Sequence, residues 1–281
     1  WGNRNSAPFF VDALNDALDL GATRVVTVLT SAYSCYSSCR QYREDLAAAV
    51  EAVGPAADGL VVDKVRPYAV HPGLGRAWLR ALLDSVRSLD DPASAHVLYV
   101  THSVPEAMDD TSGPGDGEGN LYADQHVRLA RRLTDEVNRE LGLEVEGELV
   151  FCSRSGPPTQ PWLEPDVNDR IEELAATGGV TVVCAPIGFV SDHMEVVHDL
   201  DTEAAETAER VGVPFVRVAT PGTDELFVEG LVDLLLERAA EARGEVVVPE
   251  TWLPGDVRPS VCAPGCCPNL RTVRPALCGS D

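Results

Sequence analysis

Histidine and carboxylate side chains follow the ends of two apolar segments of the sequence. His102 stands just after one such segment, and Glu195 follows another, residues 180–187, through a short loop. Asp199 and Glu203 come after Glu195 at intervals of four residues, which places the carboxylates along one side of a regular helix. A neutral imidazole that faces carboxylates can accept a proton or bind a divalent metal ion. The plainer alternatives are a solvated acidic helix face and a hydrogen-bonded histidine.

The segments that would position these residues alternate between strand-like and helical patterns. This alternation from residue 90 onward is typical of a parallel sheet with helices on both faces. The predicted strands are 96–100, 148–152, 180–187 and 213–219. The predicted helices are 122–141, 166–177, the acidic segment after residue 187, and 223–243. We expect Ser191 or Asp192 to cap the acidic helix. Parallel strands open their loops at one edge of a sheet. We therefore expect His102, the turn at 153–158 and Glu195 to lie close together.

The earlier part of the chain resembles the later half of a similar unit. Its predicted strands are 24–29 and 60–65, and its predicted helices are 11–20, 43–53 and 71–88. The expected fold is α/β with two Rossmann-like lobes on parallel sheets, the first apparently incomplete at its N-terminal end. We expect three parts. Residues 1–88 would form the remainder of the first lobe, and residues 89–243 the second lobe, whose last helix could pack back on the first. Residues 244–281 would form a Cys-rich tail.

Aromatic and proline residues accompany the histidine and carboxylates. Trp162 follows the turn SRSGPP at 153–158, and a loop rich in hydroxyls and tyrosines occupies 30–42. A wide apolar slot in which one histidine and one glutamate face each other suits a planar aromatic ligand. This loop is a second candidate edge of the site, although its hydroxyls could equally cap the helix that follows them.

The charge of the chain narrows the classes of partner. With 45 acidic and 22 basic residues the net charge is −23, whereas nucleic-acid binding needs a basic face. A cationic substrate or a metal ion suits this charge better. The sequence has no apolar run long enough to span a membrane, no signal peptide and no glycine-rich nucleotide motif. We expect a cytoplasmic protein that uses no nucleotide.

The eight cysteines are unevenly distributed, with half of them in the last twenty residues or so. Their number alone would allow the disulfide framework of a secreted protein, but a chain of this length has enough apolar residues for a core. Clustered thiolates in a cytosolic protein more often hold a metal ion or an iron–sulfur cluster.

Three stretches of the chain carry a resemblance to a known family. They are THSVPE at 101–106, SRSGPP…PWLEPDV at 153–167 and PIGFVSDHMEVVHDLD at 186–201. These strings resemble the ferrochelatases, most closely the actinobacterial branch that uses coproporphyrin III. The resemblance extends to about residue 243, and the stretch 186–201 is its most specific part.

The resemblance implies insertion of Fe²⁺ into a porphyrin in a cleft between two lobes. His102 would match the family's active-site histidine and Glu195 the acidic residue that faces it, both catalytic and in contact with the metal, with Asp199 and Glu203 extending the metal-binding row. We expect His102 to accept protons and Glu195 to assist iron delivery, although the sequence leaves this division open. Coproporphyrin III is favoured over protoporphyrin IX as substrate. The porphyrin contacts would come from Tyr33, Ser34, Ser155, Gly156, Pro157 and Trp162.

The resemblance also implies a [2Fe–2S] cluster with one internal and three C-terminal ligands. Cys39 matches the internal position, and the expected tail ligands are Cys262, Cys266 and Cys267, with Cys278 able to replace one of the adjacent pair. Free or zinc-bound thiols are the alternative. Two other functions compete with the ferrochelatase reading. One is a related chelatase for cobalt or nickel, and the other is a non-catalytic porphyrin or haem carrier or iron–sulfur sensor.

Overall fold

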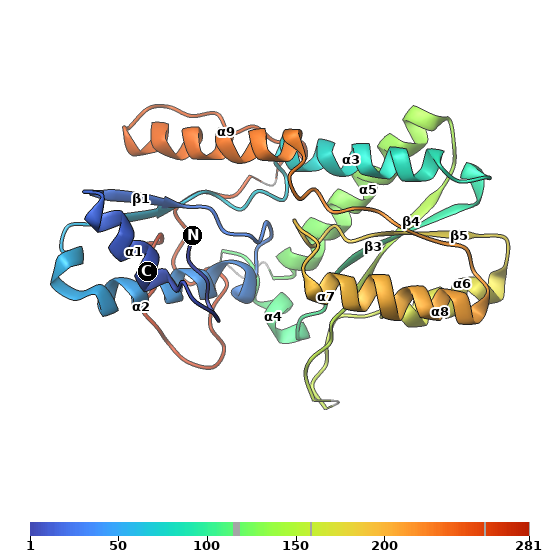
Figure 1. The fold of residues 1–281 in the computed structure, drawn as a ribbon, viewed down its shortest axis with the longest axis horizontal. Coiled ribbons are helices and arrows are strands. Elements are labelled where there is room, and N and C mark those ends of the chain that lie inside the picture. The colour runs from blue at the N-terminus through green and yellow to red at the C-terminus, as the bar shows by residue number, and fades with distance from the viewer. Residues whose placement is uncertain (115–118, 158, 256, 281) are drawn as a thin grey trace.

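Two lobes, each built on a parallel sheet, make up the molecule (Figure 1). The computed structural model describes residues 1–114, 119–157, 159–255 and 257–280, so position 158 of the SRSGPP turn lies outside the described residues. Within these ranges the first sheet pairs β1 (Arg24–Thr27) with β2 (Val61–Lys64), and the second has the order β4 (Glu146–Cys152), β3 (Ala95–His102), β5 (Thr181–Ala185), β6 (Phe215–Arg217). Neighbouring strands are parallel throughout. The expected α/β fold with parallel sheets is confirmed.

Helices cover the sheets where the apolar periodicity predicted them. In the first part of the chain they are α1 (Phe10–Asp19), the π-helical segment η1 (Tyr36–Arg40), α2 (Gln41–Val53), the short turn η2 (Gly54–Ala57) and α3 (Pro72–Arg87). In the second part they are η3 (Pro92–Ser94), α4 (Glu106–Asp110), α5 (Leu121–Leu141), α6 (Val167–Thr177), α7 (Met194–Val196), the π-helical segment η4 (Val197–Ala204), α8 (Ala205–Val211) and α9 (Glu225–Ala242). None of the helices among the described residues is long and apolar enough to cross a membrane.

The alternation of side chains along β3 divides the core of the second lobe into two layers. Val97 and Tyr99 pack in the cluster that includes residues of α3 and α5, whereas Leu98 and Val100 pack in the cluster that includes residues of α6 and α8. Successive side chains of a strand point to opposite faces, and Figure 1 shows these helices on opposite sides of the sheet. The same alternation sends Thr101 toward α5 and His102 toward the layer that contains α7.

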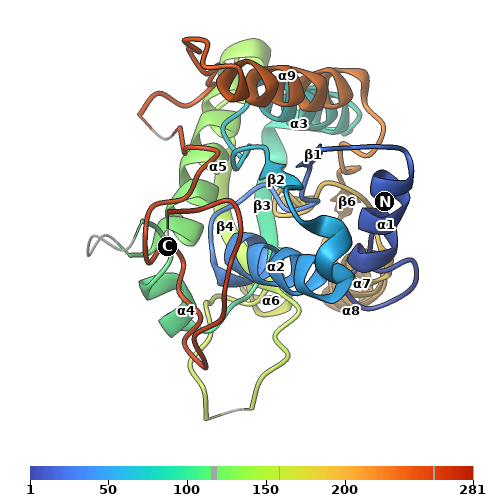
Figure 2. The same ribbon diagram turned by 90° about the vertical axis from the view of Figure 1, so that its left-hand side faces the viewer.

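Helix α9 and the C-terminal tail connect the two lobes. α9 packs against α3 and also forms ion pairs with the first lobe, Arg238 with Asp63 at 2.6 Å and Glu237 with Arg66 at 2.7 Å. The tail then passes over the first lobe to lie beside α2 (Figure 2). There the Leu277 amide donates to the carbonyl oxygen of Arg43 at 3.1 Å. The predicted domain limits after residues 88 and 243 stay predictions.

The acidic segment after β5 differs from the single regular helix that the spacing predicted. Its N-cap is His193, which accepts a hydrogen bond from the Val196 amide, so the expected cap at Ser191 or Asp192 is wrong. Asp192 instead binds Arg217 at 2.7 Å, which takes its carboxylate away from the helix end. Beyond the first turn the chain is π-helical over η4, a conformation that is rare and often found at functional sites.

Candidate active site

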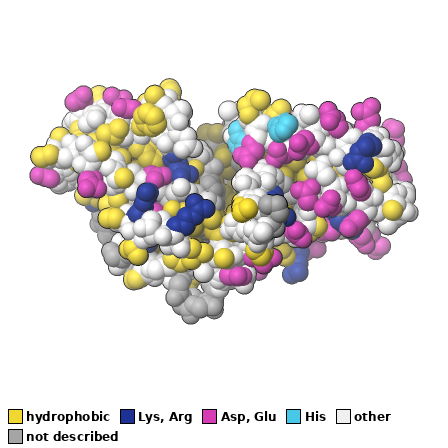
Figure 3. Space-filling model, turned by 90° about the horizontal axis from the view of Figure 1, so that it is seen from below, with side chains coloured by type: hydrophobic (Ala, Val, Ile, Leu, Met, Phe, Trp, Pro, Cys, Tyr) yellow, Lys and Arg dark blue, Asp and Glu magenta, His cyan; other side chains and the backbone are white. Residues whose placement is uncertain are grey.

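A pocket of about 630 Å³ lies between the lobes and contains the predicted histidine and glutamate. On the face seen from below, histidine and acidic side chains gather beside the hollow between the lobes (Figure 3). The volume is in the range of pockets that enclose most of a small organic ligand. The first lobe and the segment before it contribute Arg4, Asn5, Thr30, Ser31, Tyr33, Ser37, Ser38 and Tyr42. The second lobe contributes His102, Met108, Tyr122, Trp162, Phe189, His193 and Glu195, among others.

His102 and Glu195 meet at the carboxyl edge of the second sheet. His102 is the last residue of β3, and Glu195 is in the first turn of α7, directly after the loop that leaves β5. The Nε2 atom of His102 lies 3.2 Å from Oε1 of Glu195, and both side chains are partly exposed, at 34% and 46%. The expectation that the loops of parallel strands would bring these residues together therefore holds in the structure.

The backbone fixes which nitrogen of His102 faces the glutamate. Nδ1 of His102 is hydrogen-bonded to the carbonyl oxygen of Ser103. Since a carbonyl oxygen can only accept, Nδ1 carries the proton, and Nε2 is the atom free to act as a base. An unprotonated Nε2 and a carboxylate oxygen approach each other closely when a proton or a cation lies between them. The pair is thus arranged to take up one positive charge from the pocket.

A buried network holds the floor of the pocket behind His102. The hydroxyl of Tyr122 donates to the carbonyl oxygen of His102 at 2.9 Å, and it also bonds with Thr101 at 2.8 Å. Nε2 of His126 bonds with the same Thr101 hydroxyl at 2.9 Å, and the His126 ring stacks on Tyr33 with centroids 3.6 Å apart. Burial lowers the pKa of His126 to about 3, so this imidazole is neutral near pH 7.

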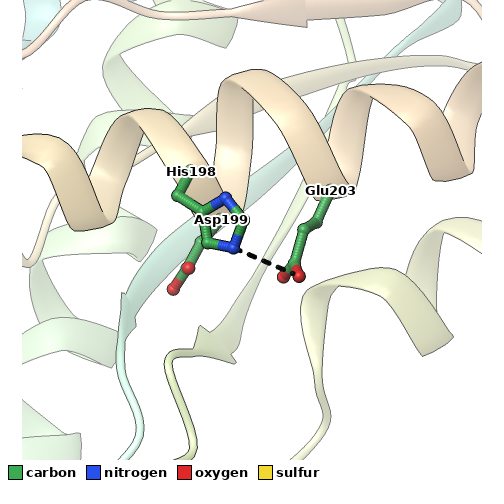
Figure 4. A group of neighbouring side chains, drawn as sticks. All are labelled: His198, Asp199 and Glu203. Carbon is green, nitrogen blue, oxygen red and sulfur yellow. Dashed lines mark ion pairs between the residues drawn. The ribbon is translucent and has the colours of Figure 1, made fainter.

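A histidine and two carboxylates form a group on η4 (Figure 4). The ligand atoms of His198, Asp199 and Glu203 lie within 4.8 Å of one another. A π-helix pairs residue i with i+5, which brings His198 Nε2 to 3.5 Å from Glu203 Oε1. Asp199 also accepts a hydrogen bond from the hydroxyl of Ser153, at the end of β4. The spacing predicted Asp199 and Glu203 as neighbours but gave no ligand role to His198, because on a regular helix this residue would point away from Glu203.

The predicted porphyrin contacts fall into two groups. Tyr33 and Trp162 line the pocket, although Tyr33 is nearly buried and its hydroxyl donates to the carbonyl oxygen of Ile187 at 2.6 Å. Ser34, Ser155, Gly156 and Pro157 are not among the residues that line it. Gly156 lies against the Trp162 ring, where an added Cβ would come within 2.4 Å of ring atoms. Gly156 therefore packs directly against the Trp162 ring.

The sequence analysis gave no role to some of the lining residues. Phe189 and His193 belong to the loop after β5, and their rings contact each other edge to face with centroids 5.3 Å apart. Their position directly after a buried strand was a usable signal. Tyr42 also lines the pocket and belongs to the candidate loop 30–42, whereas Arg4 and Met108 come from segments whose periodicity carries no sign of a ligand.

The four cysteines of the predicted cluster surround a second, small cavity. Cys39, Cys262, Cys266 and Cys267 line about 50 Å³ of space together with Ser34 and other residues, whereas Cys278 does not. The Cys262 side chain lies next to those of Cys266 and Cys39. The sulfurs of Cys266 and Cys267 are 3.8 Å apart.

The geometry of the sulfurs bears on which metal group would fit. A single tetrahedral ion with metal–sulfur bonds of about 2.3 Å would need all four sulfurs within about 4 Å of one another. In the described part of the chain, no three of the cysteine sulfurs lie within 4.8 Å of one another. The contacts instead run in a line from Cys39 through Cys262 and Cys266 to Cys267. An extended set of four thiols fits a two-iron cluster, which takes two thiolates per iron.

Comparison with solved structures defines the class of fold. SirB from Bacillus subtilis with Fe³⁺ matches with a TM-score of 0.57 at 13% sequence identity, over 86% of this chain and 81% of that one. The chain therefore shares its two-lobed α/β fold with SirB.

Sequence comparisons narrow this class to one family. Residues 1–239 match the family model described as Ferrochelatase. The chain is similar to proteins named coproporphyrin III ferrochelatase. The one from Streptomyces griseus subsp. griseus is 47% identical over the whole chain and 76% of that protein. The one from Leifsonia xyli subsp. xyli is 43% identical over 99% of this chain and 74% of that protein. The chain belongs to the ferrochelatase family, enzymes that insert Fe²⁺ into a porphyrin in haem biosynthesis.

Proposed function

We propose that the porphyrin substrate is coproporphyrin III and that the pocket between the lobes is where iron enters it. The observation that carries the site is the pair formed by His102 Nε2 and Glu195 Oε1, 3.2 Å apart at the wall of a pocket of about 630 Å³. The choice of porphyrin is supported by the relatives named coproporphyrin III ferrochelatase, at 47% and 44% identity over the whole chain.

The reaction exchanges two pyrrole protons for one ferrous ion. In our proposal Nε2 of His102 accepts protons from the pyrrole nitrogens, because its Nδ1 proton is already donated to the Ser103 carbonyl. Glu195 offsets the positive charge that develops on the imidazole and assists the entering Fe²⁺. Asp199 and Glu203 continue the row outward along η4 and lead ions or protons between solvent and the pocket.

The aromatic wall would hold the macrocycle flat against this pair. Trp162 and Tyr33 are the proposed contacts within the pocket. Ser155, Gly156 and Pro157 would act from behind Trp162, whose ring leaves no room for a side chain at Gly156. Ser34 lines the cysteine cavity instead. We therefore propose that Ser34 contacts the group bound there and not the porphyrin.

We propose that Cys39, Cys262, Cys266 and Cys267 hold a [2Fe–2S] cluster, an electron carrier whose four ligands are thiolates. The support is the cavity that these residues share and the linear order of their sulfurs. A further sign is the Ser34 hydroxyl, which is buried beside the cavity and has no hydrogen-bond partner among the described residues. Cys278 is the less suitable ligand, because its thiol donates to the Val62 carbonyl oxygen at 3.3 Å.

Anaerobic incubation with Fe²⁺ and coproporphyrin III, in parallel with protoporphyrin IX, tests the proposed substrate. Loss of porphyrin fluorescence should be fast with coproporphyrin III, slow with protoporphyrin IX, and absent from a His102→Ala variant. Equal rates with the two porphyrins would contradict the proposed preference. Full activity of the variant would remove His102 from the proton transfer.

The cluster is tested by a matched pair of cysteine variants. Cys39→Ser should lose the visible absorption of the cluster together with its iron and acid-labile sulfide, whereas Cys278→Ser should keep all of them. Loss in Cys278→Ser with retention in Cys39→Ser would reverse the ligand assignment.

A further inference from the structure

Lys64 is the single lysine of the chain, which uses arginine at every other basic position. It is the last residue of β2 and is 1% exposed. Within the described ranges its ammonium donates to the carbonyl oxygen of the adjacent Val65, at 3.4 Å, and pairs with no carboxylate. Its neighbour Asp63, whose side chain points to the opposite face of the strand, is occupied by Arg24 and Arg238.

The surroundings of this ammonium are thiols. Lys64 and Cys39 share the wall of a very small cavity, and the charge of Lys64 acts on the thiols of Cys39, Cys262 and Cys278. Arg43 is a second cation close to Cys262, but its Nε donates to the carbonyl oxygen of Leu277 at 2.6 Å. The one lysine of the protein is therefore placed against the cysteine site and, among the described residues, pairs with no carboxylate.

A buried ammonium without a counter-charge is costly, by several kcal/mol in real proteins. Neutral thiols cannot offset this cost, since they are weak hydrogen-bonding groups. A cluster held by four thiolates is negatively charged in both redox states and becomes one unit more negative on reduction. The negative charge of the cluster would offset the positive charge of the Lys64 ammonium. The Ser34 hydroxyl, which has no partner among the described residues, would be able to donate a hydrogen bond to the cluster.

We propose that Lys64 is the buried counter-charge of the iron–sulfur cluster and sets its reduction potential. The inference rests on the proposed cluster at Cys39, Cys262, Cys266 and Cys267. Because the reduced cluster carries more negative charge, the ammonium stabilises it more than the oxidised form and raises the potential. Lys64 thus acts on the cluster through space and is a positioning and tuning residue, not a ligand.

A redox titration followed by electron paramagnetic resonance tests this role in the full-length, cluster-containing protein. Lys64→Met, which keeps the length of the side chain and removes its charge, should change the ratio of oxidised to reduced cluster at least tenfold at a fixed potential. That change corresponds to about 59 mV for a one-electron couple, toward lower potential. Loss of the cluster from this variant alone would equally support a required counter-charge.

The control is Arg24→Met, which removes a positive charge from the adjacent strand β1. Arg24 is 43% exposed and pairs with Asp63, on the other face of the sheet, so its removal should leave the potential unchanged. A Lys64→Met protein with a full cluster and the wild-type potential would overturn the proposed role of Lys64. A wild-type protein without iron and sulfide would instead overturn the proposed cluster, and the role of Lys64 with it.

A second measurement needs no substitution. Because the chain has one lysine, protein labelled with ¹⁵N at the lysine Nζ should give a single side-chain nitrogen signal. We expect the chemical shift of an ammonium and strong broadening by the paramagnetic reduced cluster. A sharp signal from the cluster-containing, reduced protein would place Lys64 too far from the cluster and contradict the proposal.

Discussion

At the scale of single residues, we expect the charge of Glu195 to be needed for metal insertion but not for porphyrin binding. Glu195→Gln keeps the shape of the side chain but removes the carboxylate 3.2 Å from His102 Nε2. We expect kcat to fall about 100-fold or more, in the range of general acid–base effects, with porphyrin affinity changed less than about threefold. Steady-state rates and fluorescence titration of porphyrin would measure the two effects.

The control for this substitution is Glu209→Gln, an exposed carboxylate on α8. It removes the same charge from the same layer of the second lobe, so any general effect of net charge would appear in both variants. Equal loss of activity in the two proteins would mean that Glu195 has no specific role.

The residue scale also shows what the sequence could and could not predict. His102 and Glu195 could be found because each follows a buried parallel strand, where the geometry of the sheet brings them together. The bond from His102 Nδ1 to the Ser103 carbonyl oxygen could not be foreseen. It depends on the backbone conformation where the chain leaves β3, for which the residue types give no pattern.

At the scale of elements, Arg217 holds the acidic π-helical segment in place. Its guanidinium lies at the end of β6 and binds Asp192 before α7 and Asp201 within η4, both at 2.7 Å. These bonds fix the chain on both sides of Glu195 and Asp199. Arg217→Gln should therefore raise the KM for Fe²⁺ roughly tenfold, which corresponds to about 1.4 kcal/mol, with little change in porphyrin binding.

Initial rates over a range of Fe²⁺ concentrations would check the role of Arg217. Arg217→Lys should recover part of the iron affinity, and Arg210→Gln, which breaks an exposed ion pair with Glu172 on the same layer, should behave as wild type. An unchanged KM for Fe²⁺ in Arg217→Gln would show that η4 keeps its geometry without this clamp.

The π-helical form of η4 is the element that periodicity could not predict. Apolar spacing located the helix itself, because Val196, Leu200 and Ala204 recur every four residues and are buried. That spacing is compatible with an α-helix as well as with a slightly wider one. The difference is decided by tertiary contacts, including Arg217 to Asp201 and Ser153 to Asp199, which join residues far apart in the sequence.

At the scale of the whole molecule, the pocket exists because segments from both lobes face each other. The strand and helix order predicted the sheet of the second lobe and the edge that carries His102. It could not predict that Arg4 and Asn5 would help to complete the opposite wall. Such pairings depend on how the lobes dock through α9 and the tail. A single sequence does not indicate which residues of the two lobes will face each other.

Two buried histidines make the stability of the whole molecule depend on pH. Burial lowers the pKa of His126 to about 3 and that of His71 to about 4, from an ordinary value of 6.5. Below pH 6.5 the unfolded chain binds protons that the folded protein does not. The contribution of these histidines to the free energy of unfolding is therefore at its maximum above pH 6.5. It declines as the pH falls toward 4, by up to about 1.4 kcal/mol per pH unit for each histidine.

Replacing one of these histidines tests the origin of that decline. In His126→Gln the pH dependence between 6.5 and 4 should become shallower by about one proton, whatever the change in absolute stability, because the glutamine does not titrate. Denaturant unfolding at several pH values measures this slope, and His198→Gln, which removes an imidazole that is 64% exposed, should keep the wild-type slope. If His126→Gln were as steep as wild type, His126 would have to be protonated in the folded protein. Its stacking on Tyr33 and its bond to Thr101 would then belong to an imidazolium, which the burial of this site opposes.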